Sequence, residues 1–113
     1  MTKVLFLIVS GEEAGAKAEA GIAVAARSLS AKRYEDLKVL FFGPSEKFIA
    51  EAEGPTREMI KQLIDGKAVD SACVFIAEKG GIKDKLLSFG VELMPAGERI
   101  AHYVNNGYQV ITF

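Results

Sequence analysis

Short, continuous apolar runs recur along the chain and alternate with segments of helical character. An unbroken apolar run is typical of a strand buried on both faces, as in a parallel sheet, because a strand with one wet face alternates apolar and polar residues. No hairpin turn signature separates these runs, so helices are expected to connect them. The expected strands are residues 3–10, 37–43, a segment that begins at 69, 91–94 and 108–113.

The segments between the runs carry helix signals. Residues 14–29 are rich in alanine, whose small side chain favours helices and allows close approach to a sheet. Ser45 suits the N-cap of a short helix. In the helix expected at 54–66, Pro55 suits the first turn and Gly66 the position just past the end. Two further helices are expected at 83–89 and 96–107.

Length and composition limit how these elements assemble. The chain has 113 residues, of which 50% are hydrophobic, which is enough for one sizeable core and too short for two. The sequence therefore predicts a single domain over residues 1–113. Its expected fold is a three-layer α/β/α sandwich with a mainly parallel five-stranded sheet.

Charge and cysteine content exclude several classes of partner. Lys and Arg number 14 against 15 Asp and Glu, so the basic excess of a nucleic-acid-binding protein is absent. No run approaches the roughly 20 apolar residues that span a bilayer, and the first run is too short for a signal peptide. A single cysteine forms no internal disulfide and suits a reducing compartment. We expect a cytoplasmic protein with no nucleic-acid or membrane partner.

A ligand site in an open parallel sheet lies outside the carboxyl ends of the strands. Here the residues that follow the apolar runs are expected to line such a pocket: Ser10, Gly11, Gly43, Pro44 and Met94. No phosphate-binding glycine loop or cluster of metal-ligating residues accompanies them. We therefore expect no cofactor and no metal ion.

Cys73, the one cysteine, reaches that edge only if the third strand stops beside it. A strand from 69 to about 77 would make Cys73 an inert core residue. A strand that ends at about 73, followed by a helix to Gly80 and Gly81, would place Cys73 at a strand-to-helix junction. Free backbone N–H groups at such a junction favour a nucleophilic thiolate. Pattern alone leaves both interpretations open.

Several stretches together resemble the DsrE/DsrF-like family of sulfur-relay proteins, the TusD/YchN-like group. They are VLFLIVSG with its Ala-rich helix, LKVLFFGPSEKFIAEA, SACVFIAEKGGI, FGVELM and NGYQVITF, which cover nearly the whole chain. The residues after Cys73 are bulkier than those of some relay members, so the resemblance does not fix the subgroup.

The resemblance implies the same α/β/α fold and a function as a sulfur carrier or sulfurtransferase that moves persulfide sulfur through Cys73. It implies homo-oligomers, as trimers or hexamers, and sulfur donor and acceptor proteins as partners. The alternative is a non-catalytic homo-oligomeric binding or scaffold protein in which Cys73 is structural. A peroxidase role for the same thiolate stays open.

Other chemistry-bearing residues favour ordinary roles. His102 lacks an orienting partner in the pattern and is expected to be a surface or partly buried histidine. Lys79 and Lys83 are expected to be solvated. Glu12 and Glu13 suit the first turn of a helix better than a metal site. A response-regulator switch is excluded, because the third strand offers Cys73 where that fold needs an aspartate.

Overall fold

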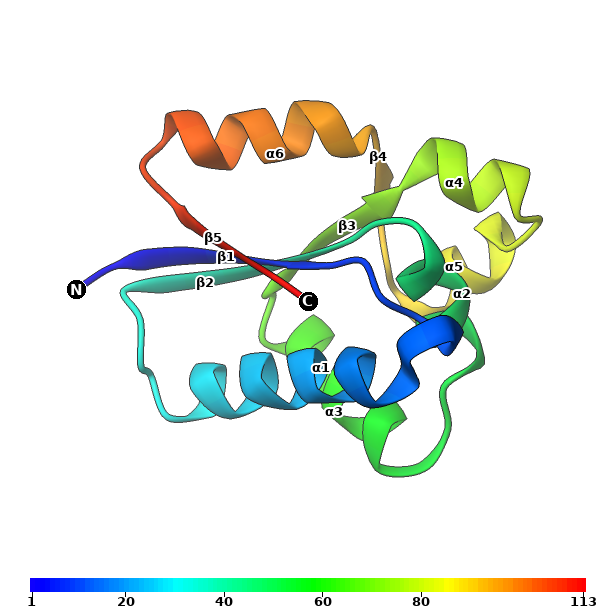
Figure 1. The fold of residues 1–113 in the computed structure, drawn as a ribbon, viewed down its shortest axis with the longest axis horizontal. Coiled ribbons are helices and arrows are strands. Elements are labelled where there is room, and N and C mark those ends of the chain that lie inside the picture. The colour runs from blue at the N-terminus through cyan, green and yellow to red at the C-terminus, as the bar shows by residue number, and fades with distance from the viewer.

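The computed structural model describes all residues, 1–113, and shows five parallel strands in one sheet (Figure 1). The strand order is β4-β3-β2-β1-β5, and every neighbouring pair runs parallel. The strands are β1 (Lys3–Ile8), β2 (Asp36–Phe41), β3 (Val69–Cys73), β4 (Leu93–Met94) and β5 (Gln109–Thr112).

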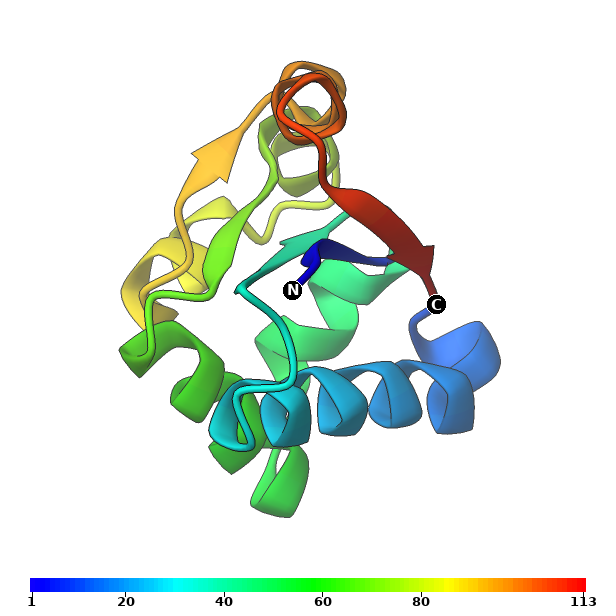
Figure 2. The same ribbon diagram turned by 90° about the vertical axis from the view of Figure 1, so that its left-hand side faces the viewer.

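Helices cover both faces of the sheet and its carboxyl edge (Figures 1 and 2). Helices α1 and α3 lie on one face and α6 lies on the other. Helices α2, α4 and α5 gather where the strands end. The helical elements are η1 (Glu12–Ala14), α1 (Gly15–Ser30), α2 (Pro44–Glu51), α3 (Gly54–Asp65), α4 (Val74–Lys79), α5 (Lys83–Phe89) and α6 (Ala96–Asn105).

The two faces of the sheet bury cores of very different size. On β1, Val4, Phe6 and Ile8 belong to a cluster of 18 buried residues under α1 and α3. Leu5, on the opposite face of the same strand, belongs to a cluster of only five buried residues under α6. Burial on both faces is why β1 is an unbroken apolar run.

These observations confirm the predicted three-layer fold and its parallel five-stranded sheet. The third strand ends at Cys73 and α4 begins at Val74, so the shorter of the two predicted strands is correct. No helix of the chain combines the length and the apolar character that a bilayer crossing demands.

One predicted helix cap is wrong in detail. Helix α2 begins at Pro44 with Gly43 as its N-cap, because proline is pre-organised for the first helical position. Ser45 therefore lies inside the helix, where its hydroxyl donates to the Ile8 carbonyl at 2.6 Å. The other predicted cap is confirmed, because α3 ends at Asp65 and Gly66 is the first residue past it, followed by Lys67 with a positive φ.

Candidate functional site

Cys73 lies where β3 turns into α4, at the carboxyl edge of the sheet. It is the last residue of the strand and the N-cap of the helix, with an extended backbone at φ −68° and ψ 121°. The strand stops here because Val74 begins a helical turn that Gly80 and Gly81 end. A single residue thus belongs to both elements, as the second interpretation of the sequence required.

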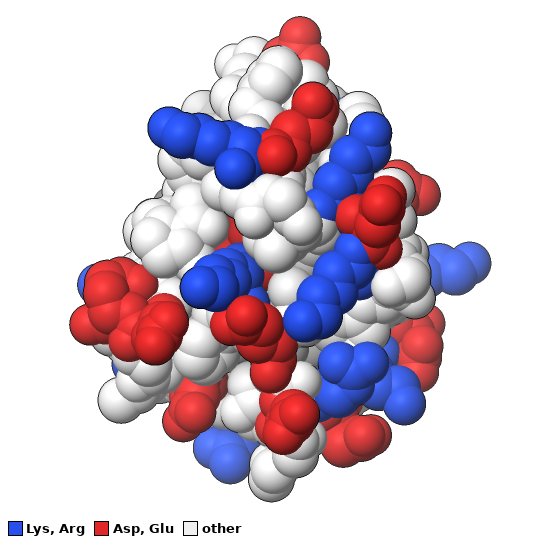
Figure 3. Space-filling model, turned by 90° about the vertical axis from the view of Figure 1, so that its right-hand side faces the viewer, with Lys and Arg blue, Asp and Glu red and all other residues white.

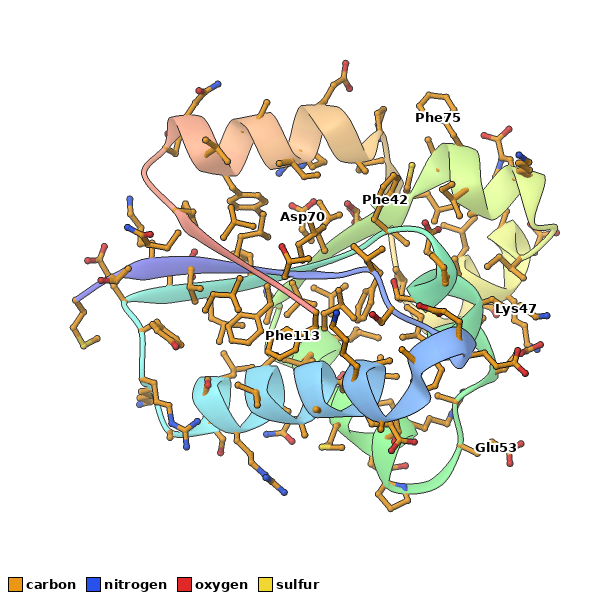
Figure 4. The ribbon with its side chains drawn as sticks, viewed as in Figure 1. Phe42, Lys47, Glu53, Asp70, Phe75 and Phe113 are labelled. Carbon is orange, nitrogen blue, oxygen red and sulfur yellow. The ribbon has the colours of Figure 1, made fainter.

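The Cys73 side chain faces the thin layer under α6 and is only 3% exposed. Its cluster comprises Leu5, Leu40, Ala96 and Tyr103, with Phe42 and Ile76 among the half-buried side chains packed against it. In Figure 4, Phe42 points from the end of β2 toward this layer, whereas Phe75 points away from α4 into solvent. The sulfur is therefore covered by side chains and by α6.

The residues predicted to line a pocket all lie at this edge, in two groups. Met94 is the strand partner of Cys73 in the β3–β4 ladder. Ser10, Gly11, Gly43 and Pro44 lie around the ends of β1 and β2, and a Cβ atom on Gly11 would collide with the Pro44 carbonyl. The structure thus brings Met94 to the cysteine and the other four to each other.

The largest cavity at this edge, about 660 Å³, does not include Cys73. It lies between η1, α1 and α2, and of the predicted pocket residues only Pro44 lines it. Its other lining residues are mainly acidic and include Glu12 and Glu13. The Glu13 carboxylate accepts the Gly11 N–H at 2.7 Å, which fits the expected role at a helix start.

Glu46, which sequence reasoning missed, is a buried polar side chain at the start of α2. It is completely buried, and its Oε2 atom accepts the Gly43 N–H at 3.2 Å. Burial raises the pKa of Glu46 to about 7, although hydrogen bonding from the backbones of Gly43 and Cys73 lowers it in part. Its Oε1 atom has no hydrogen-bond partner.

A sequence signal for Glu46 exists but is obscured by the choice of cap. A glutamate three residues after the N-cap reaches back to the N-cap N–H in a capping box. Counting from Ser45 places Phe48 at that position, whereas counting from Gly43 places Glu46 there. Pro44, read as the first helical residue, would have identified the pair.

A half-buried ionic cluster around Asp70, which Figure 4 labels, joins α6 to β3 over the layer that contains the cysteine. Asp70 on β3 accepts hydrogen bonds from Arg99 at 2.8 and 3.1 Å, from the Tyr103 hydroxyl at 2.6 Å and from the Ser71 hydroxyl at 2.8 Å. Burial raises the pKa of the Asp70 carboxyl, but these bonds outweigh burial and hold the pKa below its usual range. The β2–β3 ladder shifts register here, because Val39 pairs with Val69 and Leu40 with Ser71, so Asp70 has no partner on β2.

The remaining candidates lie away from the thiol. His102 is exposed on α6, about 9 Å along the helix axis from the Ala96 end that packs near Cys73. Lys79 and Lys83 are exposed as well. No group of three or more His, Cys, Asp or Glu side chains is arranged to hold a metal ion. Positive and negative side chains are interspersed on the side of the molecule shown in Figure 3.

Comparison with known proteins gives matches in structure only. No protein-family model matches the sequence, and no curated protein matches it. A conserved protein of unknown function from Bacteroides thetaiotaomicron, BT1422, has a similar structure, with a TM-score of 0.80 and 15% identity over 98% of this chain and 95% of that one. The ychN protein from E. coli matches with a TM-score of 0.78 and 17% identity over the whole of both chains. The chain therefore has the same α/β fold as the ychN protein.

Proposed function

We propose that the protein is a sulfur carrier that accepts and passes on persulfide sulfur through Cys73. The observation that carries the proposal is the position of Cys73, at a strand-to-helix junction on the carboxyl edge of a DsrE-like sheet. In open parallel sheets this edge is where ligands bind. The backbone N–H groups that open α4 lie next to the sulfur in the chain and favour an anion there.

The reaction needs one nucleophile and no metal or nucleotide. The Cys73 thiolate attacks the outer sulfur of a donor persulfide, R–S–S–H, and forms a new S–S bond to that sulfur. The donor's own S–S bond breaks, and its electron pair leaves on R–S⁻, which takes a proton from water. Cys73 then carries the S–S–H group, with no net oxidation. A second thiol accepts the outer sulfur by the same exchange, because the chain has no second cysteine.

Access to the sulfur requires movement of the residues that cover it. Met94 is 38% exposed and Phe42 and Ile76 are half-buried, so rotation of these side chains is the smallest change that opens a path to Cys73. Docking of a donor protein against this edge would supply the energy for that change. Phe75, 65% exposed on α4, offers such a donor an apolar contact beside the thiol.

The burial of Cys73 is also the observation that favours a second candidate function. A thiol that is 3% exposed among apolar side chains suits a non-catalytic binding or scaffold protein that uses its surface for subunit contacts. Exposed valines beside the free edge of the sheet, Val104 and Val110, fit a homo-oligomer in either case. A trimer or hexamer, acting in the cytoplasm with sulfur donor and acceptor proteins, belongs to the proposal.

Sulfur uptake measured by intact mass tests the proposed function. We expect the native protein, after incubation with a persulfide donor and removal of excess reagent, to gain one sulfur atom that a reducing thiol removes. The matched control is Cys73→Ser, which should gain none. No gain by the native protein, with a thiol that resists alkylation until unfolding, would contradict the proposal and favour the scaffold function.

A further inference from the structure

Strand β5 leaves one margin of the sheet without a partner. The strand order β4-β3-β2-β1-β5 places it at the end of the sheet, where it pairs with β1 on its inner side. In Figure 2 no other strand lies beside its outer side, and α6 and α1 lie on the two faces of the sheet next to it. A strand in this position presents unpaired backbone N–H and C=O groups that a further strand can bind.

The unpaired groups belong to Val110 and Thr112. The Phe113 N–H donates to the Leu7 carbonyl on β1 at 2.9 Å, so the backbone of Phe113 faces β1. Along a strand, the backbone groups of successive residues point alternately to the two sides in the plane of the sheet. Ile111 therefore bonds to β1 as well, whereas Val110 and Thr112 point outward. The free edge thus offers two donors and two acceptors.

The edge of β5 lacks the features that normally prevent pairing with another chain. Exposed edge strands in native proteins are usually very short or carry charge, proline or a bulge. Strand β4, at the other margin, has two residues and lies between Glu92 and Pro95. Strand β5 has four residues, three of them β-branched, and residues 107–113 contain no charged side chain although 26% of the chain is charged. The contrast indicates that the β5 edge is covered by a strand and the β4 edge is not.

A second copy of β5 satisfies every outward group of the first. In an antiparallel pair with a two-fold axis at Ile111, Val110 lies opposite Thr112 of the second copy, and these two residues exchange both of their hydrogen bonds. The symmetric pair does the same. Ile111 then faces Ile111 of the second copy, so β-branched side chains meet on both faces and no like charges are opposed. Val110, now 39% exposed, would be covered.

The neighbouring register fits this edge less well. With the axis at Val110, Thr112 would lie opposite Tyr108 of the second copy. The Tyr108 N–H already donates to the Tyr103 carbonyl of its own chain at 3.0 Å, so the Thr112 carbonyl would lack a donor. The axis at Ile111 leaves no such group, which favours it.

We propose that two copies of this chain join through antiparallel β5 strands, in the register centred on Ile111, so that their sheets become one continuous sheet. A larger assembly built from this pair contains an even number of chains. Strands β1 and β2 separate β5 from β3, so the contact leaves the Cys73 edge of each copy free. The pairing depends on backbone groups at the sheet margin and holds whether Cys73 carries sulfur or is structural.

Disulfide formation tests the register. In a Cys73→Ser background, oxidised Ile111→Cys should form a covalent dimer on a non-reducing gel, because the Cα atoms of this non-hydrogen-bonded pair would be about 4.5 Å apart. Val110→Cys is the matched control, since its Cα lies about 8 Å from that of its own counterpart, beyond the reach of a disulfide. No covalent dimer from Ile111→Cys, or as much from Val110→Cys, would overturn the inference.

Sedimentation equilibrium tests the contact without a cross-link. The native protein should contain an even number of chains, and Thr112→Pro should halve that number. Proline at 112 removes an outward N–H and costs no hydrogen bond to β1, so the pair loses two bonds and its dissociation constant rises on the order of a hundredfold. Thr112→Val keeps the backbone donor and should assemble as the native protein does.

A native monomer, an odd-numbered assembly, or a folded Thr112→Pro protein that assembles unchanged would overturn the inference. The cross-link needs no proline, so a Thr112→Pro chain that folds poorly does not remove the test. Sulfur uptake by intact mass is read separately. Uptake without the β5 contact supports the sulfur-carrier function and overturns the pairing, and the contact without uptake does the reverse.

Discussion

Backbone contact between Gly11 and Pro44 joins the loops that follow β1 and β2. A Cβ atom at position 11 would collide with the carbonyl of Pro44, which is backbone and cannot rotate away as a side chain can. Gly11 is needed here for space, because a side chain at this position has no room. The contact therefore fixes how the two loops meet at the carboxyl edge.

We expect Gly11→Ala to lower the free energy of unfolding by about 2 kcal/mol, because the added methyl forces the loops apart. Urea denaturation measures the change. Gly97→Ala is the matched control, since a Cβ there meets nothing within 4 Å and lies in an exposed helical turn. That control should gain stability by about 0.5 to 1 kcal/mol. A Gly11→Ala protein as stable as the native one would contradict the steric argument.

The sequence identified Cys73 as a residue of interest but left its surroundings open. A run such as VDSACVFIA has the same apolar pattern whether it forms one long strand or a strand followed by a helix. Glu46 could not be found from burial signals, because a glutamate in a short helix is normally exposed. Its burial comes from tertiary packing of α2 against α4 and α5, which the local pattern does not contain.

Among the elements, α6 is held to the sheet by hydrogen bonds to one carboxylate. Asp70 on β3 accepts hydrogen bonds from both Arg99 and Tyr103 on α6. The Asp70 side chain is 10% exposed and that of Arg99 is 26% exposed, so solvent screens the pair only in part. Loss of the Asp70 charge leaves donors on α6 without their acceptor.

We expect Asp70→Asn to lower the free energy of unfolding at pH 7 by about 2 kcal/mol, as is typical of hydrogen bonds to a charged group. The pKa of Asp70 is lowered in the fold, so its contribution is present above the usual aspartate range and is lost as the pH falls below it. The difference between native and variant should therefore vanish in strong acid. Urea denaturation across this pH range measures it.

Hydrogen exchange adds a local readout to the Asp70→Asn comparison. Amides of α6 should exchange faster in the variant, while those of α1 should change less, because α1 lies on the other face. Asp65→Asn, at the exposed end of α3, is the control and should change stability by only a few tenths of a kcal/mol. Uniform acceleration in both helices would show that the cluster does not act on α6 in particular.

Element boundaries followed the sequence closely where the signals were local. Helix α5, Lys83–Phe89, begins and ends at the predicted residues, since Gly90 with positive φ stops it. The predicted N-cap at Ser45 is wrong, because Pro44 fixes the first helical φ one residue earlier. The parallel sheet was predictable from its doubly buried strands, but the pairing of β5 with β1 was not. Nothing in the pattern of an apolar run says which edge of the sheet it joins.

At the scale of the whole molecule, the carboxyl groups of Asp70 and Glu46 change stability with pH in opposite directions. Asp70 adds stability as the pH rises through the usual aspartate range, because its pKa is lowered in the fold. Glu46 has its pKa raised, from 4.5 to about 7, so the folded chain holds a proton that the unfolded chain has lost. Its contribution is fully present below about pH 4.5 and is lost as the pH rises toward 7.

We expect the Glu46 contribution to reduce the free energy of unfolding by about 3 kcal/mol between pH 4.5 and about 7, at ~1.4 kcal/mol per pH unit. Stability is then greatest in mild acid. Urea denaturation at a series of pH values measures the slope, and Glu46→Gln should flatten it. Parallel curves for the two proteins across this range would show that Glu46 titrates alike in the folded and unfolded chain.

The two faces of the sheet contribute differently: the larger cluster stabilises the fold, and the smaller one covers the Cys73 sulfur. The cluster under α1 and α3 has 18 buried residues, whereas the one that holds Cys73 has five. A fluctuation that lifts α6 gives up the smaller set of contacts and leaves the larger one intact. Exposure of the thiol is then a local equilibrium with its own free energy, lower than that of global unfolding. Substitutions in α6 would change the fraction of time that the sulfur is exposed to solvent. Substitutions in α1 would change the free energy of global unfolding.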